Sequence, residues 1–311
     1  MELRYLRYFV AVAEEQSFSR AADRLQMAQP PLSAQIRQLE DEIGDRLFER
    51  TTRRVELTPA GVAFLERARS VLGMVDDAVE HARRAARGEV GRLRVGFTGS
   101  ATYELLPALA RRFRERYPDV VLELSGEMLT PAQVGALLAD ELDVAFLRPP
   151  VHAAGLEVQV LRREPLIAVL PAHHPLAERR RVRLGELSDE PFVTYPSRWR
   201  SVVYDAVVDA CRAAGFAPRA TLEVQETATL VSFVAAGLGV ALVPASVRHL
   251  RVTGAVTRPL AGTTSIVELA VAWRAEERSP TLDRFLAVAQ AFGRDLPIIP
   301  GVANGGIPTA F

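Results

Sequence analysis

Several residues after Arg92 are of types that together bind a small anion. Gly99 and Ser100 follow a short apolar run, so backbone N–H groups and a hydroxyl lie where a strand gives way to a helix. Thr130 precedes a proline at the expected start of another helix. Arg148 follows a further apolar run, where a guanidinium can hold a carboxylate through two parallel hydrogen bonds. Taken alone, Ser100 and Thr130 are better explained as ordinary helix caps, and Arg148 could equally serve an internal ion pair.

Polar residues near the N-terminus are of types that read DNA. A glutamine can pair with adenine through two hydrogen bonds, an arginine can pair with guanine or hold a phosphate, and a proline can contact the methyl group of thymine. The residues available at the start of one predicted helix are Gln29, Pro30, Pro31, Ser33, Gln35 and Arg37. A short basic hairpin after this helix adds Arg50, Arg53 and Arg54, which we expect at phosphates or in the minor groove. Alone, these residues could also be a helix cap and a solvated surface.

Short helices are predicted to position the DNA-reading residues. Apolar residues recur at helical spacing from Leu3 to Ala13, and Ser17 can cap a second short helix. Pro30 and Pro31 suit the first turn of a third helix, because proline lacks the N–H that would be unpaired there, and we expect this helix to end at Gly44. Two short helices joined by a tight turn make a helix-turn-helix.

A long helix is predicted from Thr58-Pro59 to about Gly88. Its apolar residues keep a spacing of three and four, at Leu65, Ala68, Leu72, Val75, Val79, Ala82 and Ala86. This spacing is typical of a coiled-coil seam. Because a single long helix with such a seam has no core of its own, we expect it to need a partner chain. The residues expected at the dimer contact are Leu65, Leu72, Val75 and Val79.

From Arg92 onward the pattern changes to alternating strands and helices. Strands are predicted at 93–97, 120–124, 144–147, 166–170, 192–194, 220–224, 240–243 and 267–273. Helices are predicted at 103–117, 131–140, 201–214, 227–236 and 281–292. Such alternation implies parallel sheets covered by helices, and its length favours two small α/β lobes with a cleft between them.

The composition narrows the class of protein. The 311 residues contain 38 Lys plus Arg and 38 Asp plus Glu, so the bulk charge excludes a non-specific polyanion binder. The single Cys211 excludes a disulfide scaffold and a cysteine-based zinc site, and we expect it in the core. His173 and His174 have no third ligand at metal spacing, so no metal is expected, and Gly237 and Gly239 lack the full dinucleotide-binding pattern, so no cofactor is expected. Without a signal-like or membrane-spanning segment, we expect a cytoplasmic protein.

Two N-terminal stretches resemble the DNA-binding signature of LysR-type transcriptional regulators. The first runs from Phe9 through Ser17-Phe18-Ser19-Arg20-Ala21-Ala22 to Leu39-Glu40, and the second runs from Leu47-Phe48-Glu49-Arg50 to Leu57-Thr58-Pro59-Ala60-Gly61. Farther along, Phe97-Thr98-Gly99-Ser100, Asp143–Arg148 and Val234–Ser246 look like the effector-binding half of that family. They are similar to the subgroup that senses benzoate, muconate and chlorocatechol-derived diacids. The resemblance ends at about Arg294.

The resemblance implies a mixed fold. An N-terminal all-α winged helix-turn-helix with a long linker helix would precede an α/β sensor domain with two lobes, like a periplasmic binding protein. Together with the predicted elements, this divides the chain into a DNA-binding domain (1–58), a dimerisation helix (59–88), an effector-binding domain (89–293) and a loosely ordered tail (294–311). Lobe I would take about 92–162 and 267–293, and lobe II about 163–266.

The resemblance also implies partners and a site. The family forms homodimers or homotetramers that bend promoter DNA, and an effector alters the bend and the recruitment of RNA polymerase. In the muconate-responsive regulators, the positions that match Ser100 and Thr130 hold the effector. The expected effector-binding residues are Ser100, Thr130, Arg148, Pro196, Ser197 and Thr227.

Two segments differ from the pattern of the subgroup, so the chemical identity of the effector is not fixed by the resemblance. Arg198-Trp199-Arg200 is bulkier and more cationic than the short polar stretch expected, and Leu129 stands where a glycine is usual. The fold alone would also allow a solute-binding protein or an enzyme, but the helical front argues against the first. The sequence contains no Ser-His-Asp order, phosphate loop or paired acid motif that would support an enzyme. The sequence therefore favours a transcriptional regulator controlled by an aromatic acid or a muconate-like dicarboxylate, or by a different small anion from another pathway.

Overall fold

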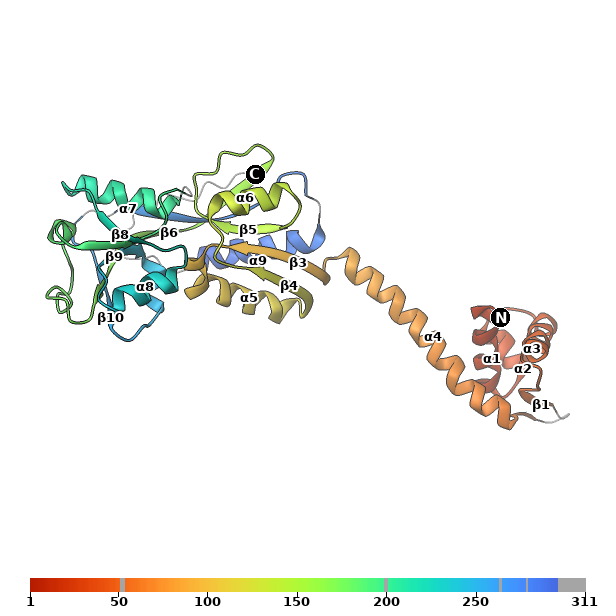
Figure 1. Cartoon of the computed structure of the whole chain (residues 1–311). Coiled ribbons are helices and arrows are strands. Elements are labelled where there is room, and N and C mark those ends of the chain that lie inside the picture. Colours follow the sequence, from red (N-terminus) through yellow and green to blue (C-terminus); the bar gives the residue numbers. More distant parts are fainter. Residues whose placement is uncertain (51–53, 199–200, 263–264, 278, 296–311) are drawn as a thin grey trace. The chain divides into compact units, whose positions relative to one another are not determined.

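The computed structural model describes residues 1–50, 54–198, 201–262, 265–277 and 279–295 (Figure 1). The chain divides into two compact units, Met1–Arg84 and Ala85–Phe311. The predictions that concern Arg53, Trp199-Arg200 and the tail beyond residue 295 lie outside the described residues. Within the described part, none of the helices combines the length and the apolar character that crossing a bilayer requires.

Three helices open the first unit: α1 (Leu3–Glu15), α2 (Phe18–Arg24) and α3 (Gln29–Ile43). The local signals act as predicted. The hydroxyl of Ser17 accepts a hydrogen bond from the N–H of Arg20 at the start of α2, Pro30 and Pro31 lie in the first turn of α3, and Gly44 ends α3 with a left-handed φ of 82°. The side chains that face inward therefore belong to one helix-turn-helix core.

A two-stranded hairpin and a long helix complete this unit. Strand β1 (Phe48–Arg50) pairs antiparallel with β2 (Val55–Leu57), and helix α4 covers Pro59–Ala86. The ring of Phe9 lies 5.2 Å from that of Phe48 and 5.1 Å from that of Phe64, measured between centroids. These edge and tilted contacts join α1, the hairpin and α4 in one core.

The first half of the predicted coiled-coil seam packs inside the chain. Leu65 and Leu72 of α4 contact the helix-turn-helix core, and Ala68 is buried with them. The prediction that the long helix has no core of its own is therefore wrong for these residues. Farther along the helix, Met74 and Val79 are exposed.

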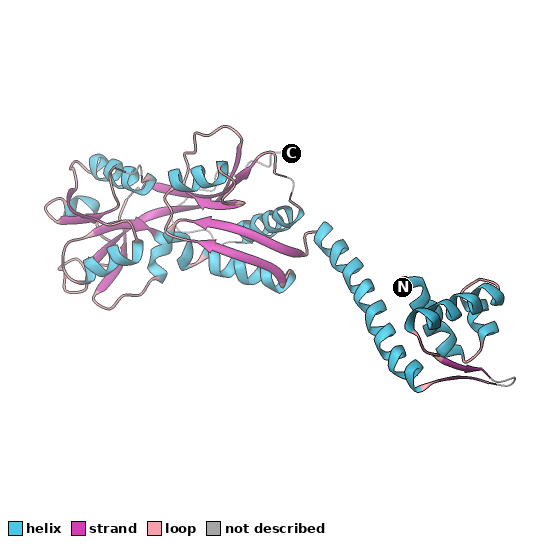
Figure 2. Cartoon of the chain, turned by 45° about the vertical axis from the view of Figure 1, so that its right-hand side comes forward, coloured by secondary structure: helices cyan, strands magenta, loops and turns pink. Residues whose placement is uncertain are grey.

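A seven-stranded sheet runs through the second unit (Figure 2). Strand β3 (Val90–Phe97) is parallel to β4 (Asp119–Ser125) and to β5 (Val144–Leu147). Strand β11 (Ile266–Arg274) is antiparallel to β5 and to the 16-residue β6 (Leu156–Pro171). The far half of β6 pairs antiparallel with β9 (Ala241–Pro244) and β10 (Ala255–Pro259).

Separate hydrophobic cores show that the second unit has two lobes. In one lobe, helices α5 (Leu105–Arg116) and α9 (Pro280–Asp295) pack on one face of the sheet, with Phe113 and Phe146 against Phe285, and α6 (Thr130–Leu138) packs on the other face. In the other lobe, α7 (Val202–Ala213) and α8 (Thr227–Ala235) pack on the far half of β6. A small parallel sheet of β7 (Pro191–Thr194) and β8 (Arg219–Glu223) belongs to this second lobe. The mixed fold with a two-lobed sensor is thus confirmed.

The elements differ from prediction in four respects. The large sheet is mixed and not parallel, because β6 and β11 run against their neighbours. Strand β6 begins at Leu156, ten residues before the predicted strand, and β10 was not predicted. The helix predicted from Tyr103 is a 3-10 turn over Gly99–Tyr103 followed by α5. Cys211 lies in the core as predicted, where burial raises the pKa of its thiol to about 12.

Candidate functional site

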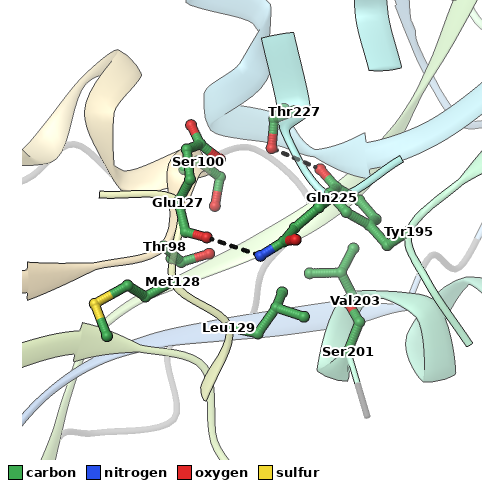
Figure 3. A pocket seen from close by; sticks show the side chains of 11 residues that line it. Thr98, Ser100, Glu127, Met128, Leu129, Tyr195, Ser201, Val203, Gln225 and Thr227 are labelled. Atoms are coloured by element: carbon green, nitrogen blue, oxygen red, sulfur yellow. Dashed lines mark hydrogen bonds between the residues drawn. The ribbon is translucent and has the colours of Figure 1, made fainter. Parts of the chain in front are cut away.

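A cleft lies where strands of both lobes end. Its volume is about 300 Å3, including the part open to solvent (Figure 3). The lining segments follow the carboxyl ends of β3, β4, β7 and β8, the edge at which α/β proteins bind ligands. The lining residues are Thr98, Gly99, Ser100, Glu127, Met128, Leu129, Tyr195, Ser201, Val203, Gln225 and Thr227. Ser100 and Thr227 are thus the two predicted effector residues that line it.

Arg148 lies behind the cleft and forms an internal ion pair, which was the alternative to ligand binding that its sequence position allowed. Its Nη2 lies 2.7 Å from Oε1 of Glu164 and donates to the hydroxyl of Ser100 at 2.8 Å, and its Nη1 donates to the carbonyl of Glu268 at 3.1 Å. Both charged side chains are buried, Arg148 being 2% and Glu164 0% exposed. Arg148 is not among the residues that line the cleft.

The charge of the buried Glu164 is stabilised by the groups around it. Burial alone would raise the pKa of Glu164, but the Arg148 guanidinium and the N–H of Ser246, which donates to Oε2 at 2.7 Å, hold that pKa below its usual value. The positive charge of Arg148 is thereby neutralised within the chain. A ligand in the cleft would meet the Ser100 hydroxyl that Arg148 holds in place, and not the guanidinium itself.

Thr130 also supports the cleft from outside. Its hydroxyl donates to the carbonyl of Arg148 at 3.0 Å and accepts from the N–H of Arg148 at 3.1 Å, which ties the start of α6 (Thr130–Leu138) to the end of β5. The helix-cap explanation is wrong for Thr130 and for Ser100. Leu129 is the cap residue of α6, and neither hydroxyl makes a capping bond.

In the second lobe, Thr227 opens α8 as predicted. Its hydroxyl lies 3.0 Å from that of Tyr195, and both side chains are buried. Burial raises the pKa of Tyr195 to about 12, so this phenol is neutral and can donate a hydrogen bond. Pro196 and Ser197 lie next to Tyr195 but outside the lining, and the exposed Ser197 hydroxyl donates to Glu223 at 2.7 Å.

Glu127 is a lining residue that sequence reasoning missed. It follows β4 with a left-handed φ of 55°, and the Gln225 amide of the other lobe donates to its carbonyl at 3.4 Å (Figure 3). Burial, together with the nearby Glu226 carboxylate, raises the pKa of Glu127. Its position at the carboxyl end of a predicted strand, on the same edge as Ser100, was the available signal.

The residues predicted to read DNA gather at the start of α3. Gln29, Pro30 and Pro31 are exposed, and the Gln29 amide donates to the Ser33 hydroxyl at 3.3 Å. Gln35 is half-buried and Arg37 is exposed, whereas Leu32, Ile36 and Leu39 on the opposite face are buried. The exposed Arg54 lies 3.6 Å from Glu56, while the side chain of Arg50 and all of Arg53 lie outside the described residues.

The two histidines singled out in the sequence lie in a turn that follows β6. Nε2 of His174 lies 3.1 Å from Glu190, and its Nδ1 accepts the N–H of Leu176. His173 lies beside Gly237. Across the described ranges, no group of three or more His, Cys, Asp or Glu is placed to hold a metal ion.

Comparison with known proteins places both parts of the chain in one family. Residues 3–62 match the family "Bacterial regulatory helix-turn-helix protein, lysR family", and residues 86–294 match the "LysR substrate binding domain". The chain is 38% identical to the HTH-type transcriptional regulator AlsR of Bacillus subtilis, over 93% of this chain and 95% of AlsR. It is 39% identical to the HTH-type transcriptional regulator BenM of Acinetobacter baylyi, over 90% and 92%.

A solved structure agrees with the sequence match. Full-length CbnR complexed with its target DNA has a TM-score of 0.81 and 33% identity to this chain, and the match covers 94% of this chain and 100% of CbnR. A crystal structure of CbnR, a LysR family transcriptional regulator, gives a TM-score of 0.82 with 93% and 100% covered. The chain therefore belongs to the LysR family: it is a DNA-binding transcriptional regulator with an effector-binding domain.

Proposed function

We propose that the cleft of the second unit binds a small carboxylic acid and that the bound acid controls how the first unit engages promoter DNA. The observation that carries the proposal is the convergence of the Ser100 hydroxyl, the Thr227 hydroxyl and the N-terminus of α8 in one cleft. The resemblance to regulators of aromatic catabolism favours an aromatic acid or a muconate-like dicarboxylate. A different small anion from another pathway is the alternative.

The six predicted effector residues take different parts in this proposal. Ser100 and Thr227 contact the acid directly, because both line the cleft. Arg148 and Thr130 act as positioning residues, since Arg148 holds the Ser100 hydroxyl and Thr130 holds the backbone of Arg148. Pro196 and Ser197, the last two of the six, shape the edge of the cleft beside Tyr195.

On DNA, we propose that α3 reads base edges in the major groove. Its exposed N-terminal turn supports this, because small and polar residues allow the end of a helix to approach the bases. Full-length CbnR is a similar protein whose structure has been solved in complex with its target DNA. The residues proposed for base edges are Gln29, Pro30, Pro31, Ser33, Gln35 and Arg37, and those proposed for phosphates are Arg50, Arg53 and Arg54.

The proposed assembly is a homodimer or homotetramer that acts with RNA polymerase. Residues 1–58 would bind DNA, 59–88 would link and dimerise, and 89–293 would bind the effector, with a loosely ordered tail over 294–311. The exposed Val79 supports a contact through the later part of α4. Leu65, Leu72 and Val75 are partly covered in the single chain, so they would contribute at the edge of that contact.

Acid binding is tested by thermal melting of the full chain with benzoate, cis,cis-muconate, chloromuconates and amino acids. An acid present at about 100 times its dissociation constant should stabilise the fold by about 2.7 kcal/mol. Ser100→Ala should abolish most of this shift, because it removes a hydroxyl that lines the cleft. The exposed Ser188 lies outside the cleft, so Ser188→Ala is the matched control and should keep the shift. Failure of every acid in the panel to raise the melting temperature would contradict the proposal.

A further inference from the structure

Glu127 lines the cleft, and its side chain lies beside Ser100 (Figure 3). It lies against the backbone of Gly99, where the missing side chain makes room for it: a Cβ atom placed on Gly99 would collide with Oε2 and lie 2.6 Å from Oε1. The left-handed backbone of Glu127, at φ 55°, is a conformation that residues other than glycine adopt at a cost. Two features of the backbone therefore serve to place this one carboxylate.

Glu127 also connects the two lobes. The Gln225 amide of the second lobe donates to the Glu127 carbonyl at 3.4 Å, and the N–H of Thr227, at the start of the nine-residue α8, lies near enough to the Glu127 carboxylate to favour its charged form. The N–H groups at the start of a helix are the natural partners of an anion. Glu127 therefore places a carboxylate of the chain beside the helix N-terminus that an acid in the cleft would also approach.

The groups that face Glu127 offer it no cation among the described residues. Glu226 approaches from the loop before α8, Tyr103 from the end of the 3-10 turn, and Tyr195 from the segment after β7. Arg148 lies behind Ser100 and is neutralised by Glu164. Burial and the Glu226 charge raise the pKa of Glu127, and the Thr227 N–H opposes them.

A second carboxylate that enters this cleft meets a like charge in a partly desolvated site. Two carboxylates in one site do not both stay ionised, and the pair holds one proton between them. We propose that Glu127 sets the charge of the ligand: an acid effector binds as a monocarboxylate together with one proton from solvent, shared between Glu127 and the ligand, and dicarboxylates are disfavoured. This inference rests on the proposed function and decides between its two classes of acid.

The test is isothermal titration of the full chain with benzoate and with cis,cis-muconate at pH 6, 7 and 8. Each titration is repeated in phosphate and in Tris, whose different heats of ionisation reveal proton uptake. We expect benzoate to bind with uptake approaching one proton and with an affinity that falls by up to tenfold per pH unit above the pKa of Glu127. Muconate should bind more weakly than benzoate.

Glu127→Gln is expected to bind benzoate without proton uptake and without this pH dependence. Its affinity for benzoate at pH 8 should be at least tenfold higher than that of the unmodified chain, and the gain for muconate should be larger. Glutamine has the same shape, and the backbone carbonyl that accepts from the Gln225 amide is unchanged, so we expect the fold to be preserved. Glu226→Gln, which removes the same charge from an exposed neighbour, is the matched control and should keep the proton uptake.

The outcomes separate this inference from the function on which it rests. Benzoate or muconate binding to the unmodified chain with no proton uptake would overturn the role of Glu127 and leave acid sensing intact. Equal uptake by Glu127→Gln and the unmodified chain would do the same. Binding of neither acid to either protein would overturn both proposals. Binding that appears only in Glu127→Gln would support the inference, because the ionised carboxylate would then be what excludes the acid.

Discussion

Arg148→Met is expected to lower the free energy of unfolding of the sensor domain by about 3–5 kcal/mol, which is the usual cost of leaving one member of a buried ion pair without its partner. Glu164 is 0% exposed and would keep only the Ser246 N–H as a hydrogen-bond donor. The double variant Arg148→Met/Glu164→Gln should recover most of the loss, because the amide is neutral and can still accept from Ser246. Urea denaturation of both variants and the unmodified chain measures this.

The pH dependence of Arg148→Met has a definite sign. In the unmodified chain the pKa of Glu164 is lowered, so its contribution to stability is present above the unfolded pKa and is lost as the pH falls through the folded pKa. Without Arg148, burial raises the pKa of Glu164, and the penalty for its charge grows as the pH rises through that value. The loss in Arg148→Met should therefore shrink from pH 8 towards pH 5. A double variant no more stable than the single one would show that the pair is not the cause.

Gly61→Ala is expected to destabilise the helix-turn-helix domain by about 1–3 kcal/mol through overpacking. Gly61 lies in the first turn of α4, and a Cβ atom there would collide with the carbonyl oxygen of the buried Leu47 and lie 3.0 Å from Cδ2 of Leu57. The Leu47 carbonyl accepts the N–H of Thr58, so moving it would disturb the junction between the hairpin and α4. The better helix propensity of alanine, about 1 kcal/mol, offsets only part of this cost.

The same helix provides the control for Gly61→Ala. Gly73 has no neighbouring atom within 4 Å of an added Cβ, so Gly73→Ala should stabilise α4 by about 0.5–1 kcal/mol. Hydrogen exchange of the amides in α1, α2 and α3 measures the effect on the domain directly. Unchanged protection in Gly61→Ala, or equal effects of the two substitutions, would contradict the close approach of α4 to Leu47.

The helix-turn-helix was predictable because its signals are local. The cap at Ser17, the two prolines at the start of α3 and the left-handed Gly44 each act within a few residues of their own position. The packing of Leu65, Ala68 and Leu72 was not predictable, because an apolar stripe does not reveal whether it faces another chain or the core of its own domain.

The direction and length of the strands depend on distant partners. Leu156, Val158 and Val160 alternate with polar residues, yet the strand continues through Arg162 and Glu164, whose charges hide the pattern of a buried strand. These charges are buried with partners far away in sequence: Glu104 lies 2.7 Å from Arg162, and Arg148 lies 2.7 Å from Glu164. A pattern of hydrophobicity cannot report such pairs.

The candidate site was only partly predictable for the same reason. Ser100 and Thr227 lie at strand ends, and the rule that ligands bind at the carboxyl ends of parallel strands brings them to the cleft. Arg148 also follows a strand, but the buried Glu164 draws its guanidinium away from the cleft. Glu127 follows a predicted strand at this same edge, which indicates its place in the cleft, but its left-handed backbone and the room that Gly99 leaves for its carboxylate have no sequence signature of their own.

A small acid bound in the cleft is expected to change how this regulator holds DNA. Footprint titration of the full chain on a DNA site that the chain selects from a random pool, with and without benzoate, measures this coupling. We expect benzoate to change the dissociation constant or the extent of protection, because coupling between two sites is reciprocal. We also expect Gln29→Ala to lose preference for the selected site by about 1–3 kcal/mol. An acid that stabilises the chain yet leaves both affinity and footprint unchanged would show that the cleft and the DNA-binding unit are not coupled.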